Sequence, residues 1–374
     1  MIIIKPVKTS SEKQAFINVP KTLYKNDPNW IAPLDIMVHD QLNPKKNPTF
    51  DQLDAQLWIA YRNNQPVGRI SAQINQLHLK HQNATEGHFG FLEADSKETM
   101  HQLITTAELW LHKKGMTKIL GPFNLSINEE MGLLVDGFDT PPYFMMGHHN
   151  PAYQEWLTSI GFSKAKDVLG FSLYLEKPFS KQWQTLVKRA KSKDINTRKI
   201  NMKNYNREFD IIFDLWNDSA KDNWGFLPFE ENVITHLKSD FKFLLDPDGC
   251  IFSTQGEKTT GIMIALPNLN DALKDLNGKL LPWRWLKLLY RLKIKKIKTY
   301  RVVLGGIQSK IQNSHIGGQT LILILDRIAE EGRKKKVTHV DVSWILEDNM
   351  RLLKVIDLLG VEAYKRYRIF SKAI

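Results

Sequence analysis

The sequence contains almost no cysteine and no long apolar run. Cys250 is the only cysteine among 374 residues, which excludes a disulfide framework and a thiolate zinc site. Because no stretch of about 18 apolar residues occurs, we expect no membrane-spanning helix. Residues 1–6 lack the basic and apolar regions of a secretory signal and are predicted to form a strand. These absences favour a cytoplasmic protein with reduced thiols.

Acidic residues are fewer than basic ones. The net charge is +12, which predicts attraction to an anionic partner: a nucleic acid, an anionic membrane or a phosphorylated cofactor. A chain of 374 residues is long enough for two domains with ample cores. The basic run 188–199 supplies part of this positive charge, and it is predicted to be a solvated surface or a link between domains.

One stretch combines a strand with a glycine-bearing helix start. Residues 300–307 are predicted to be a strand, residues 312–318 a loop and residues 319–331 a helix. The free N–H groups and the dipole at a helix N-terminus attract an anion such as a pyrophosphate. The alternative, an ordinary helix start with two turn glycines, stays open on this stretch alone.

Three pairs of patterns recur in the same order in the two halves of the chain. The hairpin predicted at 57–73 matches one at 251–265, and the strand at 116–120 matches 337–343. Asn150 and Asn349 each begin a helix with apolar residues at +3, +6 and +12 and Gly at +11. This repetition predicts an internal duplication, with domains at 1–168 and 169–374.

The asparagine-led helix and the hairpin before it resemble the Gcn5-related N-acetyltransferase (GNAT) fold. The resemblance implies an α/β chain of two tandem GNAT-like domains, with mixed sheets flanked by helices. In that fold strand four splays from strand five, and an Arg/Gln-x-x-Gly-x-Gly/Ala loop binds the pyrophosphate of acyl-coenzyme A (acyl-CoA). Gln312 to Gly317 occupies that place, and residues 93–98 of the first half have no such glycines. The implied cofactor contacts in the second domain are Ile307, Gln312, His315, Gly317, Gly318 and Asn349.

Two positions depart from the GNAT pattern. His315 stands where the loop has its first glycine, and a side chain there crowds the approach to a phosphate, although an imidazole can also donate to one. Many such enzymes have a tyrosine at +7 of the last helix as acid to the thiolate, where this chain has Leu157 and Ile356. Any acid or base must therefore come from elsewhere.

Several short sequence motifs resemble those of a family of bacterial proteins with two GNAT-like halves. They include Asp27-Pro-Asn-Trp30, Gly121-Pro-Phe-Asn124 and Asn223-Trp-Gly-Phe226. Some members are similar to bacterial ceramide synthase, which acylates the amine of a sphingoid base. The resemblance implies acyl-CoA-dependent N-acyl transfer, with a lipid amine as one candidate acceptor. Two alternatives stay open: a non-catalytic ligand- or lipid-binding protein on a decayed GNAT scaffold, and a tandem GNAT transferase that uses aminoacyl-tRNA.

Residues 281–301 form a basic and apolar segment that overlaps an insertion at 270–298. Arg284, Lys287, Arg291, Lys295 and Lys298 recur at helical spacing, with Trp285, Leu286 and Leu289 on the opposite side. Such a helix is typical of a peripheral contact with an anionic membrane, here the inner membrane. A helix packed on the domain with a solvated basic face is the alternative, and nucleic acid is the least favoured partner.

Three side chains are candidates for catalysis. His148 and Glu129 are candidate bases, and Asn223 is a candidate wall of the acceptor pocket. His148 and His149 are adjacent, and neighbouring side chains in a strand point to opposite faces, so no metal site is expected. Each candidate also has a purely structural alternative. His148 can be a packed histidine, Glu129 can cap a turn in its loop, and Asn223 can belong to the C-terminal turn of a helix.

Overall fold

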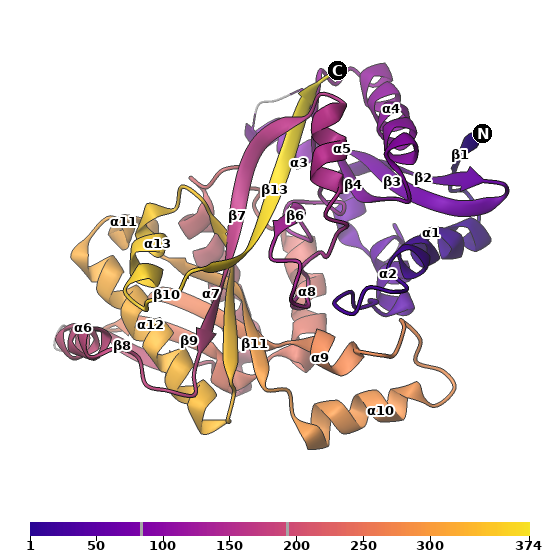
Figure 1. Ribbon diagram of the computed structural model, residues 1–374. Coiled ribbons are helices and arrows are strands. Elements are labelled where there is room, and N and C mark those ends of the chain that lie inside the picture. The colour runs from indigo at the N-terminus through magenta and orange to yellow at the C-terminus, as the bar shows by residue number, and fades with distance from the viewer. Residues whose placement is uncertain (83–84, 192–193) are drawn as a thin grey trace. The chain divides into compact units, whose positions relative to one another are not determined.

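The computed structural model describes residues 1–82, 85–191 and 194–374 as a mixed α/β chain (Figure 1). Its strands are β1 (Ile2–Pro6), β2 (Leu53–Arg62), β3 (Gln65–Asn75), β4 (Glu86–Ala94), β5 (Lys118–Gly121), β6 (Leu133–Asp136), β7 (Ser163–Tyr174), β8 (Asn196–Lys199), β9 (Cys250–Gln255), β10 (Lys258–Pro267), β11 (Thr299–Ile307), β12 (His339–Leu346) and β13 (Ala363–Ala373).

The α-helices are α1 (Ser10–Leu23), α2 (Asp35–Gln41), α3 (Gln76–Gln82), α4 (Lys97–Lys113), α5 (Tyr153–Ser159), α6 (Lys181–Lys191), α7 (Tyr205–Ala220), α8 (Glu231–Leu244), α9 (Leu269–Leu273), α10 (Arg284–Tyr290), α11 (Ser309–Gln312), α12 (His315–Lys334) and α13 (Met350–Asp357). Short turns of other helical types are η1 (Pro48–Gln52), η2 (Met202–Asn204), η3 (Pro247–Gly249) and η4 (Arg291–Lys295). In the described parts of the chain, no helix is both long and apolar enough to cross a bilayer.

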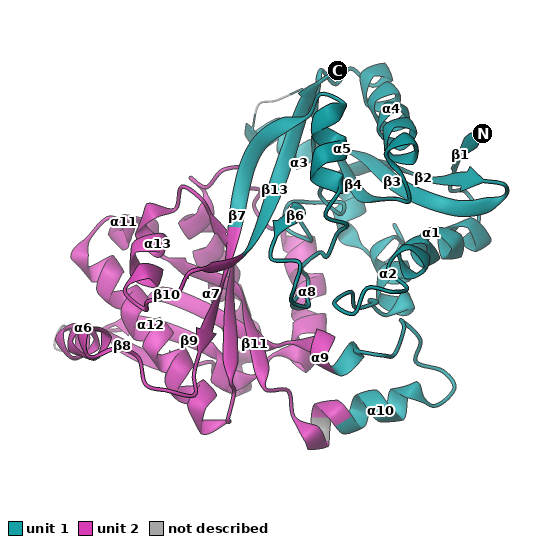
Figure 2. Ribbon diagram, in the orientation of Figure 1, with its two compact units in different colours: residues 1–168, 272–290, 365–374 teal, residues 169–271, 291–364 magenta. Residues whose placement is uncertain are grey.

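The chain divides into two compact units (Figure 2). Unit 1 contains residues 1–168, 272–290 and 365–374, and unit 2 contains residues 169–271 and 291–364. The predicted domains were contiguous, 1–168 and 169–374. The structure instead assigns residues 365–374 to unit 1, because β13 pairs there with β5 from Phe370 opposite Gly121 to Ala373 opposite Lys118.

The sheet of unit 1 runs in the order β1-β2-β3-β4-β5-β13, and β6 also pairs with β13. Asn63 and Asn64 both have positive φ in the β2–β3 turn, which suits the twist of a two-residue hairpin and confirms that predicted hairpin. Alternate residues of β2 face opposite cores: Trp58 and Ala60 pack with α4, whereas Ile59 packs with α1. Helices thus cover both faces of the sheet.

The sheet of unit 2 contains β12-β11-β10-β9-β8, with residues of β7 beside β12. The predicted second hairpin is confirmed as β9 and β10. Met263 and Ala265 of β10 pack in the core of α6 and α12, whereas Ile262 and Ile264 pack in that of α7 and α8. This period-two alternation places helices on both faces, as the sequence predicted.

Two predicted helix boundaries are corrected by the structure. Helix α12 starts at His315 rather than Gln319, because Ser314 is its N-cap and accepts from the N–H of Gly317 at 3.3 Å. The basic segment is not one helix through Lys298. It is α10, then the π-helical turn η4, and the chain is extended from Thr299, where β11 comes into register with β12.

Candidate functional site: a cavity between diverging strands

The candidate site lies where two parallel strands of unit 2 separate. Strands β11 and β12 are in register from Thr299 opposite His339 to Val302 opposite Val342. Strand β11 then continues to Ile307 and β12 to Leu346. Residues 303–307 and 343–346 line a cavity of about 940 Å³ between them. Strand divergence therefore opens the interior of the sheet to a ligand.

The walls of this cavity are largely apolar. They come from β10, β11, β12, α6, α7, α12 and α13, all within unit 2. The apolar lining residues are Leu186, Trp216, Ile262, Met263, Val302, Val303, Leu304, Ile307, Leu321, Ile322, Ile324, Val342, Trp344, Ile345, Leu346, Leu352 and Val355. A cavity of this size and lining suits a substantial apolar ligand with a few polar groups.

The first turn of α12 forms one polar part of the lining. His315, Gly317 and Gly318 all line the cavity. A Cβ at Gly317 would lie 2.2 Å from the carbonyl oxygen of Ile311, so only glycine lets the two backbones approach, whereas no heavy atom lies within 4 Å of a Cβ built at Gly318. The His315 side chain is exposed. An anion would meet backbone N–H groups and the positive end of the helix dipole here.

Gln312 fastens the segment before α12 to its surroundings. Its Nε2 donates to the carbonyl oxygens of Ser219 at 2.7 Å and Ile307 at 2.8 Å, and its Oε1 accepts from Arg351 at 3.2 Å. Gln312 and Ile307 also line the cavity. Gln312 and Ile307 were both predicted to contact the cofactor, and both are at the cavity. The hydrogen bond from the Gln312 side chain to the Ile307 carbonyl fixes the position of the loop between them.

Asn349 and Asn223 line the same cavity from two helix ends. Asn349 is the N-cap of α13, with Oδ1 accepting from the N–H of Leu352 at 3.2 Å. Asn223 lies in the turn after α7, where its N–H donates to Ala220 at 2.8 Å. The fold thus brings every predicted cofactor residue and Asn223 to one cavity.

His148 and Glu129, the other two predicted catalytic residues, belong to unit 1. His148 is buried, and its Nε2 lies 2.9 Å from Oδ2 of Asp27. Burial lowers the pKa of His148 and outweighs the raising effect of Asp27, so the neutral imidazole is favoured. Its Nδ1 is buried and has no hydrogen-bond partner among the described residues. This nitrogen is the one that can accept a proton when Asp27 holds the Nε2–H.

Glu129 accepts from Nε2 of Gln41 at 2.5 Å. Burial raises the pKa of Glu129 to about 7, against the lowering effect of hydrogen bonds from Gln41 and Asn47. A carboxyl with a pKa near neutrality can both accept and return a proton. His149, by contrast, accepts from the N–H of Leu134 at 3.0 Å, and burial lowers its pKa to about 3, so it acts as a structural acceptor.

A buried polar cluster adjoins the cavity on β12. Asp341 is fully buried and accepts from the hydroxyl groups of Ser343 and of Tyr364, the latter at 2.7 Å. The guanidinium of Arg301 lies over the ring of Trp344 at 4.6 Å. Ser343 and Trp344 line the cavity, so this cluster supports its wall at the point of strand divergence.

Other lining residues were not predicted from the sequence. Arg189, Trp216, Ser219, Arg351 and Lys354 all line the cavity. Arg189 falls in the run assigned to a solvated surface or link, of which residues 192–193 lie outside the described residues. Trp216 and Ser219 precede Asn223 by seven and four residues, and Arg351 and Lys354 follow Asn349 within five residues, so nearness in sequence could have indicated these four. Arg189 comes from a distant element.

The equivalent position in unit 1 is filled by the protein itself. Strands β4 and β5 are in register only as far as His88 opposite Leu120. A Cβ at Gly90 would lie 1.9 Å from the carbonyl oxygen of Phe123, so the loop after β5 packs directly on β4. The Tyr153 hydroxyl lies 3.1 Å from Oε2 of Glu93, within this packed interior.

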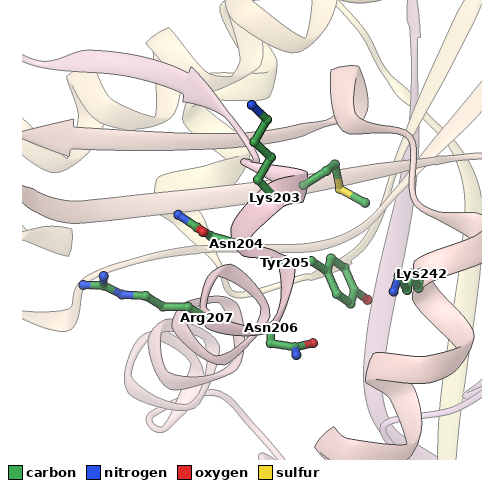
Figure 3. Close-up of a pocket in the computed structure, with 7 residues that line it drawn as sticks. Lys203, Asn204, Tyr205, Asn206, Arg207 and Lys242 are labelled. Carbon is green, nitrogen blue, oxygen red and sulfur yellow. The ribbon is translucent and has the colours of Figure 1, made fainter.

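A second hollow, of about 420 Å³, lies at the start of α7 and is lined by Met202, Lys203, Asn204, Tyr205, Asn206, Arg207 and Lys242. Figure 3 shows the side chains of Lys203, Arg207 and Lys242 pointing in different directions. They do not converge on one point, so this hollow is not built to hold a single anion.

Comparison with known proteins identifies the family. The chain is 38% identical over 372 residues to the bacterial ceramide synthase of Caulobacter vibrioides, covering 99% of this chain and 97% of that protein. It is 36% identical over 374 residues to protein YghO of Escherichia coli, covering 100% and 95%. The chain belongs to the tandem GNAT-like family of these two proteins. No family model matches the sequence.

Solved structures confirm the predicted fold of this tandem GNAT-like chain. A tandem GNAT protein from the clavulanic acid biosynthesis pathway has a TM-score of 0.58 at 10% identity, over 100% of this chain and 98% of that one. A GCN5-related N-acetyltransferase from Sphaerobacter thermophilus has a TM-score of 0.53 at 8% identity, over 100% and 95%. At such identities these likenesses establish the fold, and the chemistry must be argued from the site.

Proposed function

We propose that this protein is an acyl-CoA-dependent N-acyltransferase that transfers a long acyl chain to a lipid amine at a membrane surface. The observation that carries the proposal is the cavity between the diverging ends of β11 and β12, with the first turn of α12 in its lining. A glycine-bearing helix start beside an apolar cleft combines a phosphate site with room for an acyl chain.

The pyrophosphate of acyl-CoA is placed by this proposal at the start of α12. No heavy atom lies within 4 Å of a Cβ built at Gly318, so there is room for a ligand beside this turn, and the dipole of a 20-residue helix ends there. Arg189, Arg351 and Lys354 add positive charge to the lining and can pair with the phosphates. The exposed imidazole of His315 can donate to a phosphate from the same turn.

The cavity lining supports our proposal for the acyl chain, and one relative supports our proposal for the acceptor. The apolar walls suit a chain much longer than an acetyl group. The relative that is 38% identical is named bacterial ceramide synthase, and ceramide forms when a fatty acyl group joins the amine of a sphingoid base. A sphingoid-type amine is therefore the acceptor that we propose.

The proposed reaction is direct attack of a neutral amine on the thioester. A bond forms from nitrogen to the carbonyl carbon, the carbon–sulfur bond breaks, and the thiolate leaves. Backbone N–H groups of residues 303–307 that point away from β10 can polarise the carbonyl oxygen. Asn223 orients the acceptor from the cavity wall, and the amine proton passes to water or to a base. His148 and Glu129 stay candidates for that base from the sequence alone.

One observation favours a second candidate, a non-catalytic ligand-binding protein on the same fold. Leu157 and Ile356 are at most 1% exposed and lie in the hydrophobic cores. Neither position offers an acid to the leaving thiolate. A protein that binds the thioester without turning it over is thus the alternative that the test must separate.

The test measures thermal stabilisation by palmitoyl-CoA and acetyl-CoA, and then formation of N-palmitoyl sphinganine by mass spectrometry. Gly318→Trp fills the open space beside α12 and should abolish stabilisation, whereas Gly318→Ala should retain it. Stabilisation without product would support the binding protein. No response of the wild type to either thioester would refute both candidates.

A further inference from the structure

One segment of unit 1 exposes a cluster of large apolar side chains. Six large apolar side chains between residues 281 and 290 are exposed: Leu281, Trp283, Trp285, Leu286, Leu289 and Tyr290. Leu281 is 78% exposed and Trp283 is 73% exposed. Four of the six, Trp285, Leu286, Leu289 and Tyr290, lie on α10. Figure 1 shows this short helix. Isolated exposed apolar residues need no explanation, but such a cluster marks an interaction surface.

The opposite side of this segment is firmly attached to unit 1. Leu280 and Leu288 pack against the buried cluster of Leu34, Leu273 and Leu276. Arg284 donates to the carbonyl oxygen of Leu276, and Lys287 pairs with Asp275 at 2.7 Å. Packing, a hydrogen bond and an ion pair thus hold the inner side of the segment on unit 1. The outward tryptophans and leucines are exposed from a segment that is fixed in place.

The charge of this region selects its partner. Residues 276–301 contain no aspartate or glutamate. Their basic residues are Lys279, Arg284, Lys287, Arg291, Lys293, Lys295, Lys296, Lys298 and Arg301. Tryptophan prefers the polar–apolar boundary of a bilayer, and lysine and arginine bind the phosphates of anionic lipids. A protein partner would need a matching acidic and apolar face, and a nucleic acid would leave the leucines without a contact.

We infer that residues 281–290 dock this protein onto an anionic lipid bilayer, with Trp283, Trp285, Leu286 and Leu289 entering the interface. The exposed side chains of Lys295, Lys296 and Lys298 then contact lipid phosphates. This inference deepens the proposed function by naming its membrane element, and it does not require acyl transfer to occur.

The experiment is vesicle co-sedimentation of the full chain without acyl-CoA or acceptor. Vesicles of phosphatidylcholine with phosphatidylglycerol at about 30% should bind the wild type, and pure phosphatidylcholine should bind it about tenfold less, because lipid charge contributes to affinity. Binding to the anionic vesicles should also fall as salt is raised, because salt screens that attraction.

Two sets of variants separate the apolar and basic contributions. Trp283→Ser with Trp285→Ser and Leu289→Ser removes exposed apolar groups, and Lys295→Glu with Lys296→Glu and Lys298→Glu reverses exposed charges. Each set should reduce vesicle binding about tenfold or more. The matched control is Phe243→Ser with Leu109→Ser, which changes side chains that are 89% and 57% exposed elsewhere. This control should bind as the wild type does.

The outcomes are distinct. Failure of the wild type to sediment with anionic vesicles at low salt, or unchanged binding of both variant sets, would overturn the inference. If the tryptophan variant instead converts a dimer to a monomer in light scattering and no vesicles are bound, the surface is an interface between copies and the inference is again wrong. None of these results depends on the thioester measurements, so membrane docking and acyl transfer are judged separately.

Discussion

Val302 of β11 lies opposite Val342 of β12, and this pair is the last in the register that joins the two strands. Beyond it the sheet opens, and both strands contribute residues to one cavity. A ligand in that opening would meet strand N–H groups on one side and the start of α12 on another. The position of this single pair therefore determines how deep the candidate site is.

The length of the acyl chain should depend on the open end of this cleft. Leu346 is the last residue of β12, is half-buried and lines the cavity. In Leu346→Trp the larger side chain should occupy space that a long chain needs. We expect palmitoyl-CoA to lose about tenfold or more in affinity, while acetyl-CoA is little affected. Calorimetric titration checks this, and equal losses for both thioesters would contradict it.

The cap of α12 should link stability to ligand binding. Ser314→Ala removes the hydroxyl that accepts from Gly317, at an expected cost of about 1 kcal/mol in the free energy of unfolding. Because that turn lines the cavity, palmitoyl-CoA should also bind more weakly. Thr9→Ala is the matched control, since it removes the capping box of α1. It should destabilise similarly in urea without changing ligand affinity.

Glu129 should make stability depend on pH. Its pKa is raised from 4.5 to about 7, so folding favours the protonated form. The corresponding stability is fully present below pH 4.5 and is lost as the pH rises through about 7. Glu129→Gln should therefore match the wild type at pH 5 and exceed it at pH 8, by on the order of 1 kcal/mol. Urea titrations at both pH values measure the difference.

The control for that experiment is Glu155→Gln, which changes an exposed carboxyl in the first turn of α5. The difference in unfolding free energy between this control variant and the wild type should be the same at pH 5 and pH 8. If the stability difference between Glu129→Gln and the wild type were the same at pH 5 and pH 8, the pKa of Glu129 would not be raised toward 7.

His148 should affect turnover more than thioester binding. His148→Gln keeps a polar group beside Asp27 but removes the basic nitrogen. If His148 is the base, the rate of N-palmitoyl sphinganine formation should fall about 100-fold or more. Palmitoyl-CoA affinity should change little, because His148 is not among the lining residues. Single-turnover kinetics would detect this, and an unchanged rate would exclude His148 as the base.

Local patterns predicted many elements because their causes lie within a few residues. The Asn63-Asn64 turn adopts the positive φ values that its hairpin needs. Asn349 stands at the start of α13, where the repeated pattern begins a helix. The start of α12 was misplaced because Gly317 suggested a turn, whereas its requirement for glycine is contact with Ile311 in the folded chain.

The sequence by itself determined the hairpins, the order of elements and the family, since these depend on short spacings and on residue type. Only the tertiary structure decided that residues 365–374 pair within unit 1, that Arg189 reaches the cavity lining and that residues 281–290 display their apolar side chains outward. Each of these facts depends on which distant strand or helix packs beside a segment. Local spacing carries little information about such packing, because the same apolar pattern suits a buried face and a membrane-facing one.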